Sequence, residues 1–167
     1  MKQGFPPIAD KTATLLILGT MPGGESLKQN EYYAHPRNAF WTIMERLFGC
    51  DPPVNYKQKT RMLSENRIAL WDVIKSCKRE GSLDAKIINN TIIENDFASF
   101  FNRHPNIGTI FFNGARAKQE YVKRVLEKLS EPSRDIKLVR LPSTSPAMAQ
   151  LSLDDKVLEW SKILRAT

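Results

Sequence analysis

Four short apolar runs, rich in β-branched residues, alternate along this chain with segments whose apolar residues recur at helical spacing. The runs are residues 13–18, 68–71, 107–112 and 136–141. Continuous apolar strands of this length are typical of a parallel sheet buried on both faces. Strands that alternate with helices build a sheet with helices on both sides. The pattern therefore predicts an α/β fold, a three-layer α/β/α sandwich around a central, four-stranded, mostly parallel sheet.

Helical patterns fill the intervals between these runs. Residues 40–48 place apolar side chains at helical spacing and end at Gly49, a favoured residue after a helix end. Residues 57–66 form a more polar helix candidate. Asn95 is the expected cap of a further helix, which ends before the His104-Pro105 pair.

Two more helices follow towards the C-terminus. In the first helix, one face carries Val122, Val125, Leu126 and Leu129. The second helix, from about residue 153, is expected to bury Val157, Trp160 and Leu164. Residues 20–38 are predicted to form a long loop, and residues 75–90 are polar without a clear period. No repeat or second domain is evident, so residues 1–167 are predicted to form a single domain.

The chain is basic, which bears on its partners. Its 167 residues include 25 Lys and Arg against 18 Asp and Glu, a net charge of +7. Such a balance suits a polyanion such as nucleic acid. At this length about two-thirds of the unfolded surface can be buried, so stability requires no disulfide or metal.

The cysteine spacing and the hydropathy argue against a cysteine metal site, a signal peptide and a membrane span. Cys50 and Cys77 lack the spacing of zinc or iron–sulfur ligands and are interpreted as reduced thiols. Residues 1–10 lack the apolar core of a signal peptide, and no run approaches the roughly 20 apolar residues that span a bilayer. We expect a cytoplasmic monomer with no metal, no cofactor and no membrane partner.

The unusual residues of the chain follow the predicted strands. Loops after parallel strands gather at one edge of the sheet, where ligands bind. Residues 19–24 (GTMPGG) lack both the P-loop ending and the GxGxxG spacing. Gly23 and Gly24 allow a backbone to approach a ligand closely, although a tight turn alone would use the same residues.

The densest motif is residues 32–41 (YYAHPRNAFW). Its polar groups can position a water molecule or a base edge, and its aromatic rings can stack on a base. Asn38 has an alternative role as a helix N-cap, because Asn is favoured there. Phe40 has an alternative role in the core, because it opens the apolar face of the following helix.

Two further strand ends complete the candidate site. Asp72 follows a buried strand and can accept hydrogen bonds from a base or from loop N–H groups. The last run is residues 141–148 (LPSTSPAM), in which small hydroxyl residues and prolines suit close approach to phosphates. We expect DNA contacts from Ser143, Thr144 and Ser145, and Met148 is a candidate apolar wedge.

These motifs together resemble the signatures of the uracil-DNA glycosylase superfamily. The matching runs are residues 19–23, 33–41 and 141–147, and the resemblance covers nearly the whole chain in order and spacing. The branch most similar to it is that of the hypoxanthine (deoxyinosine) DNA glycosylases, family six. The resemblance implies a uracil-DNA glycosylase-like fold. Most branches carry a catalytic Asn or Asp where this chain has Met21, and many carry a His at Leu141, which points away from efficient uracil excision.

The resemblance also implies a role for each site residue. Asn38 matches the catalytically important Asn and is expected to orient the attacking water. Phe40 matches an aromatic residue that stacks on the flipped base. Asp72 falls where many relatives place a base-reading Asn, and the backbone at Met21 is expected to bind the base with it, while Gly23 belongs to a loop that approaches DNA.

The predicted function is therefore a monofunctional DNA glycosylase of base excision repair. It would hydrolyse the N-glycosidic bond of deoxyinosine in DNA, without a metal or organic cofactor, after extruding the damaged nucleotide. Two alternatives stay open: a mismatch-type uracil-DNA glycosylase, and a non-catalytic DNA-binding domain with a degenerate site.

Overall fold

The computed structural model describes residues 1–49 and 55–166. Its main sheet has four parallel strands in the order β3-β2-β6-β7. The strands are β2 (Leu15–Gly19), β3 (Ile68–Asp72), β6 (Thr109–Asn113) and β7 (Lys137–Leu141). The predicted fold class and all four strands are confirmed, with bounds shifted by one or two residues.

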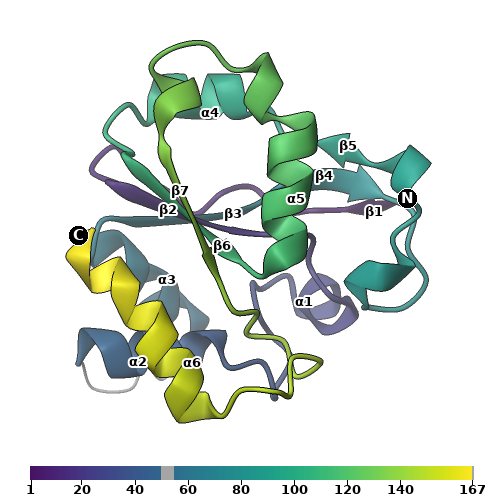
Figure 1. The fold of residues 1–167 in the computed structure, drawn as a ribbon. Coiled ribbons are helices and arrows are strands. Elements are labelled where there is room, and N and C mark those ends of the chain that lie inside the picture. Colours follow the sequence, from purple (N-terminus) through teal and green to yellow (C-terminus); the bar gives the residue numbers. More distant parts are fainter. Residues whose placement is uncertain (50–54, 167) are drawn as a thin grey trace.

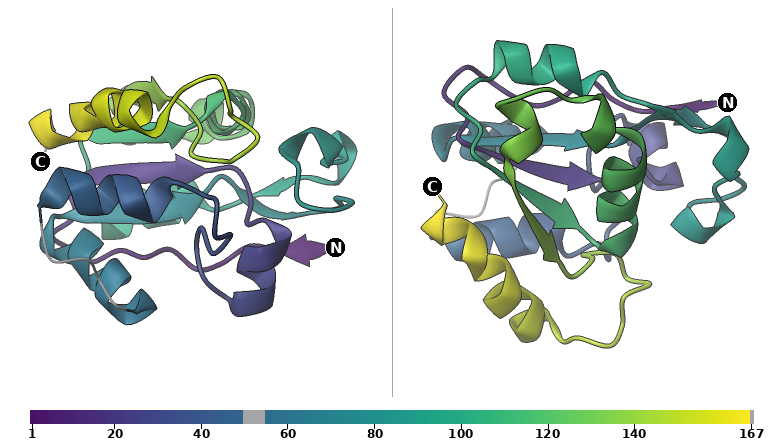
Figure 2. Two further views of the ribbon diagram at one scale, coloured as in Figure 1. Left: turned by 90° about the horizontal axis from the view of Figure 1, so that it is seen from below. Right: turned by 45° about the horizontal axis from the view of Figure 1, so that its top comes forward.

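Helices cover both faces of this sheet, as Figures 1 and 2 show. One face carries α4 (Phe97–Arg103) and α5 (Ala115–Arg124). The other carries α2 (Phe40–Phe48), α3 (Tyr56–Glu65) and α6 (Leu153–Trp160). Two short 3-10 turns follow these helices: η3 (Leu126–Lys128) comes after α5, and η5 (Ser161–Arg165) comes after α6.

The alternation of side chains along β2 explains the two layers of core. Leu16 and Leu18 pack with the aromatic residues of α4 and with Tyr121 of α5. Leu15 and Ile17 pack on the opposite face with the apolar residues of α2, α3 and α6. Because successive strand residues point to opposite faces, one fully apolar strand can serve both cores.

Three details of the predicted helices are wrong. Asp96, not Asn95, caps α4, since its carboxylate accepts from the Ser99 N–H. Val122, placed on the apolar face, and Leu164, predicted to be buried, are 40% and 43% exposed. α5 instead buries Ala117, Glu120 and Tyr121, so Val122 lies beside the buried face. Leu164 lies in the 3-10 turn η5, whose tighter winding departs from the ideal helical spacing.

A second, smaller sheet has the strand order β1-β4-β5. Its strands are β1 (Lys2–Gln3), β4 (Ile74–Cys77) and β5 (Ile93–Glu94), all antiparallel. The β4–β5 connection contains the 3-10 turns η1 (Asp84–Lys86) and η2 (Asn89–Thr91). A short helix, α1 (Gly24–Gln29), lies within the predicted loop. These elements were not predicted from the sequence.

Cys77 is a free, buried thiol, whereas Cys50 lies outside the described residues. Among residues 1–49 and 55–166, no helix has the length and apolar content needed to cross a membrane.

Candidate functional site

A cavity of about 750 Å³ lies at the edge of the main sheet where the parallel strands end. Segments far apart in the sequence line it together: residues 19–26, 32–38 in part, Asp72, residues 82–85, Asn113 and residues 143–148. Of the predicted site residues, the structure brings together Met21, Gly23, Asn38, Asp72, Ser143, Thr144, Ser145 and Met148. The expected convergence of strand-end loops is therefore present, while the roles of the individual residues stay predictions.

The loop after β2 offers backbone rather than side-chain chemistry. The Met21 side chain is buried and packs against Ile74 and Cys77 of β4 and against Ile87 of the β4–β5 connection. The Pro22 carbonyl accepts a 2.5 Å hydrogen bond from Arg79, and the Gly24 N–H donates to the Ser82 hydroxyl. The β4–β5 connection thus holds this loop in place.

Asn38 precedes α2, and the oxygen of its side-chain amide accepts a hydrogen bond. Its Oδ1 accepts a 3.0 Å hydrogen bond from the Phe40 N–H. The N-cap position belongs to Ala39, which makes no side-chain cap. Among the described residues, none accepts a hydrogen bond from the Asn38 Nδ2, so this donor and the second lone pair of Oδ1 are available to a ligand.

Phe40 does not lie where a base-stacking residue must lie. Its side chain is 0% exposed and packs in the core beside Trp41 and Trp160. The ring of Tyr33 stacks on it, with the centroids 4.2 Å apart and the planes inclined by 26°. Tyr33 lines the cavity, as does Tyr32, whereas Phe40 does not, so the ring of this stacked pair that reaches the cavity is that of Tyr33.

The floor of the cavity is formed by two polar groups that lack partners. Asp72 Oδ2 and Tyr33 Oη are buried, and neither makes a hydrogen bond to the described part of the chain. A Cβ on Gly19 would lie 2.4 Å from Asp72 Oδ1 and 2.8 Å from Tyr33 Oη, so only glycine leaves room for both groups. Buried polar groups without partners beside a cavity are candidates for contact with a ligand.

Burial is the main cause that raises the pKa of the Asp72 carboxyl to about 8. The neighbouring Asp84 carboxyl raises it further, and the Arg79 guanidinium opposes the rise. Burial likewise raises the pKa of the Tyr33 hydroxyl, and Asp72 adds to that effect. Removing a charge from water in this way favours the neutral form of both groups.

Asp84, on the turn η1, is a cavity residue that sequence reasoning missed. Its Oδ1 lies 3.8 Å from Nη1 of the buried Arg79. Burial is the first cause that raises the pKa of its carboxyl, while Thr20 and Arg79 lower it. No periodic pattern marks residues 75–90, so the sequence held no signal for this placement.

The loop after β7 is anchored by Asn113, at the end of β6. The Asn113 amide donates to the Thr144 hydroxyl and accepts from the Thr144 N–H, both at 2.9 Å. Thr144 is 1% exposed, so its hydroxyl supports the loop and is not free to meet a phosphate as predicted. The hydroxyls of Ser143 and Ser145 accept loop N–H groups and keep their own protons for donation.

Comparison with known proteins places this site in a family. Residues 6–165 match the model of the uracil DNA glycosylase superfamily. The chain belongs to this superfamily.

Two relatives and one solved structure illustrate the similarity. The hypoxanthine DNA glycosylase of Methanosarcina acetivorans is 36% identical over 166 residues, 99% of each chain. That of Methanosarcina barkeri is 41% identical over 117 residues, 70% of this chain and 73% of the relative. A solution NMR structure of a uracil DNA glycosylase candidate from M. acetivorans has a TM-score of 0.80 and 35% identity, and the match covers 98% of this chain and 96% of that one.

Within the superfamily, this chain departs from the common motifs at two buried positions. Met21 and Leu141 are 7% and 1% exposed, and both are apolar. Neither side chain can position a water molecule or stabilise a departing base by a hydrogen bond. The polar groups that can do so here are Asn38, Tyr33, Asp72 and Asp84.

Proposed function

We propose that this protein is a monofunctional DNA glycosylase that hydrolyses the N-glycosidic bond of deoxyinosine in DNA. The observation that supports this proposal best is the cavity itself. It combines a stacking ring, unpartnered polar groups on its floor and an Asn beside them. The names of the Methanosarcina relatives, both hypoxanthine DNA glycosylases, support the same substrate.

The substrate base must leave the DNA helix to reach these groups, because the glycosidic bond is inaccessible within the stack. In the cavity, the ring of Tyr33 stacks on the extruded base and the polar floor contacts its edge. Asn38 holds the attacking water through Oδ1, while its Nδ2 donates to the sugar or base. Each such oriented dipole contributes up to about 3 kcal/mol to the stabilisation of the transition state.

The residues that line the cavity fit attack on the sugar by water rather than by a side chain of the protein. Among the described residues that line the cavity, none is a lysine. An amine that attacked the sugar to form a Schiff base would have to lie there. Water is therefore the proposed nucleophile, the departing base carries away the electron pair of the bond, and the product is an abasic site.

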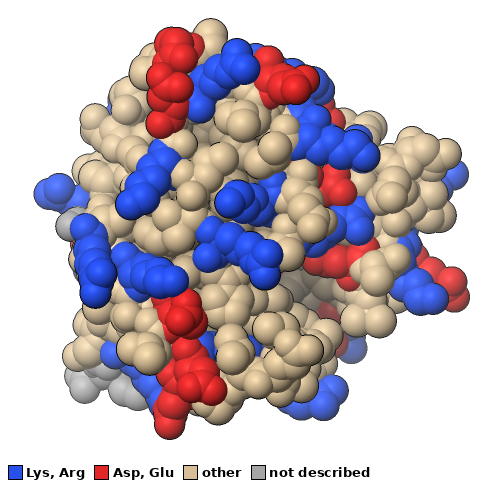
Figure 3. All heavy atoms as spheres, in the orientation of Figure 1, with Lys and Arg blue, Asp and Glu red and all other residues tan. Residues whose placement is uncertain are grey.

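The charge of the protein supports a DNA substrate. Lys and Arg side chains gather over α5 and β7 on the face shown in Figure 3. Lys123, Lys137 and Arg140 are exposed on these elements, and Arg37 is exposed at the cavity. Cationic groups of this kind bind phosphates and make affinity depend on salt.

An excision assay tests the proposal. Duplexes with deoxyinosine opposite each of the four bases are incubated with the protein and then treated with alkali, which cleaves abasic sites. We expect cleavage at deoxyinosine that depends on the protein. Binding to these duplexes without cleavage would instead support the non-catalytic alternative.

Uracil is a second candidate substrate because its edge has the same chemistry. Hypoxanthine and uracil both present a ring carbonyl next to a ring N–H, so one polar floor can bind either. Duplexes with deoxyuridine belong in the same assay. Cleavage there at a rate equal to or above that for deoxyinosine would assign the protein to the uracil branch.

A further inference from the structure

The carboxyl group of Asp72 has little around it that would hold a negative charge. Asp72 is 4% exposed, and its Oδ2 has no hydrogen-bond partner in the described chain. The neighbouring cation, Arg79, makes no hydrogen bond to it: Arg79 donates to the carbonyls of Pro22 and Gly81, and its Nη1 lies 3.8 Å from Asp84 Oδ1. A buried carboxylate without charge-stabilising partners is costly, so the group is better accommodated with its proton.

Two charged groups near Asp72 act on its pKa in opposite directions. Asp84, from the β4–β5 connection, adds a second carboxyl and so disfavours charge on the first, whereas Arg79 opposes the rise. Burial is the main cause that raises the pKa of Tyr32 and Tyr33, from the loop before α2, so both hydroxyls beside Asp72 are neutral and bring no positive charge to it.

We propose that Asp72 takes part in base excision as an uncharged carboxylic acid. Its hydroxyl donates a hydrogen bond to the ring carbonyl oxygen of the extruded base, and its carbonyl oxygen accepts one from the adjacent ring N–H. This inference rests on the proposed function and adds the protonation state of the group that reads the base.

The chemistry of the departing base requires a donor at this position. Rupture of the glycosidic bond leaves the electron pair on the base, and part of that negative charge spreads to its carbonyl oxygen. A neutral O–H stabilises this charge, whereas a carboxylate beside it would repel it in a site of low dielectric. The proton stays on Asp72, so no transfer step is needed.

The test compares the pH dependence of the wild type with that of Asp72→Asn. The asparagine side chain offers an NH2 donor group and an acceptor oxygen, as the neutral acid offers a donor and an acceptor, but it does not titrate in this range. Single-turnover excision of hypoxanthine is measured from about pH 6 to pH 10 with enzyme in excess of DNA but below saturation, so that the rate reports the titration of the free enzyme. We expect the wild-type rate constant to fall about tenfold per pH unit above a transition near pH 8. We expect this transition to be missing in Asp72→Asn.

The shared substrate provides an internal control, because the ring N–H of hypoxanthine also loses its proton at alkaline pH. A fall of the same size in both enzymes would therefore belong to the substrate and overturn the inference. So would a wild-type rate that is constant up to pH 10. Absence of excision at every pH would instead reject the proposed function.

A second variant tests the inference if Asp72→Asn does not fold. Asp84→Asn removes a negative charge that raises the pKa of Asp72. We expect it to move the alkaline transition to lower pH, whatever its effect on the maximal rate. An unchanged or higher transition would contradict the inference.

Discussion

At the scale of single residues, the site depends on Gly19, where there is no room for a side chain. Gly19 ends β2 beside Asp72, its partner in the parallel register. A methyl group on Gly19 would overlap the Asp72 carboxyl and the Tyr33 hydroxyl, at 2.4 Å and 2.8 Å. Both groups lie on the cavity floor, so the glycine determines where the carboxyl and the hydroxyl lie.

Gly19→Ala should therefore reduce single-turnover excision at least about tenfold, which corresponds to about 1.4 kcal/mol in the transition state. Gly108→Ala is the matched control, because a Cβ there meets nothing within 4 Å. Circular dichroism checks that both variants fold. A wild-type rate in Gly19→Ala would show that the carboxyl and the hydroxyl are not held in place.

The two stacked rings at the cavity should behave differently when truncated. Phe40 is fully buried, and Phe40→Ala should cost about 3–5 kcal/mol of the free energy of unfolding. Tyr33→Ala removes the ring that faces the cavity, and lost stacking should cost about 1–3 kcal/mol in excision. Thermal melting and single-turnover rates separate the effects, and Tyr33→Phe, which keeps the ring, serves as control. Normal stability with lost excision in Phe40→Ala would return the stacking role to Phe40.

Asn38→Ala tests the residue expected to orient the water. The variant loses the acceptor of the Phe40 N–H, which should cost about 1 kcal/mol of stability. Excision should fall much further, about 100-fold or more, because a positioned dipole at the reacting atoms is lost. A nearly normal single-turnover rate would remove Asn38 from the mechanism.

At the scale of elements, the sequence predicts what is apolar and periodic. The run at residues 68–71 became β3, which is buried throughout, because burial on both faces demands continuous apolar side chains. The run at residues 136–141 became β7, an edge strand whose Lys137 and Arg140 are exposed between less exposed apolar residues. The antiparallel strands β1 and β5 are two residues long and depend on distant partners, so no local pattern marks them. α1 has six residues and an N-cap, Gly23, without a side-chain hydrogen bond.

The same physics explains which site residues were predictable. Asp72 and Asn113 end apolar strands, so their position at the ligand-binding edge follows from the strand pattern. Whether Phe40 or Tyr33 faces the cavity depends on how α2 is oriented against the core. The order of aromatic residues in the sequence does not show this orientation. Asp84 reaches the cavity through long-range contacts of Arg79 and Ser82 with the loop after β2.

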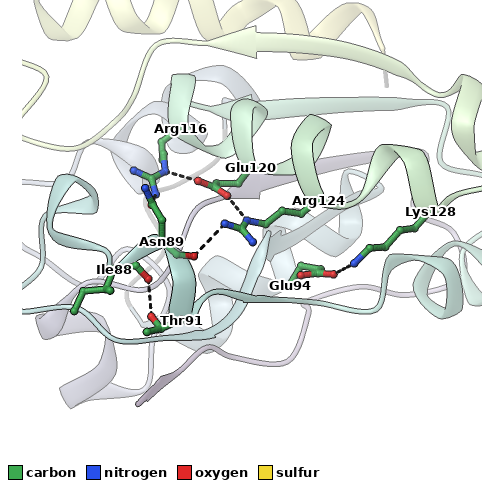
Figure 4. Close-up of polar contacts among 8 residues, drawn as sticks. All are labelled: Ile88, Asn89, Thr91, Glu94, Arg116, Glu120, Arg124 and Lys128. Carbon is green, nitrogen blue, oxygen red and sulfur yellow. Dashed lines mark hydrogen bonds and ion pairs between the residues drawn. The ribbon is translucent and has the colours of Figure 1, made fainter.

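The β4–β5 connection is held against α5 by two arginines that a buried carboxylate positions, as Figure 4 shows. Glu120 accepts from Arg116 at 2.8 Å and from Arg124 at 2.5 Å, all three residues being on α5. Both arginines also donate to Asn89, on η2. Nearby, the pair Lys128 and Glu94 joins η3 to β5 at the surface. This network holds the segment that carries Asp84 against the rest of the site.

Glu120→Gln should loosen that segment, because an amide replaces one acceptor with a donor that faces an arginine. We expect a loss of about 1–3 kcal/mol in the free energy of unfolding. We also expect faster hydrogen exchange in residues 87–94, measured by mass spectrometry. Glu127→Gln, an exposed position on the next turn, is the control. Unchanged exchange in residues 87–94 would show that other contacts hold the connection.

At the scale of the whole molecule, the buried carboxyl of Asp72 should affect stability as well as excision. Its pKa is raised from 3.8 to about 8 in the folded protein. Between these values the folded state binds a proton that the unfolded state has released, so stability falls as pH rises. The slope approaches about 1.4 kcal/mol per pH unit, and it disappears above the folded pKa.

Asp72→Asn removes this titration, so its stability relative to the wild type should increase from about pH 4 to about pH 8 and then become constant. Denaturant unfolding at a series of pH values measures the difference. Comparing two variants of one chain cancels the contributions of the carboxyls that do not interact with Asp72. Glu127→Gln, at an exposed position, is the control for the removal of a surface carboxyl. A difference that stays constant from pH 4 to pH 8 would mean that Asp72 is ionised in the folded protein, and the uncharged donor in the cavity would then be excluded without any measurement of activity.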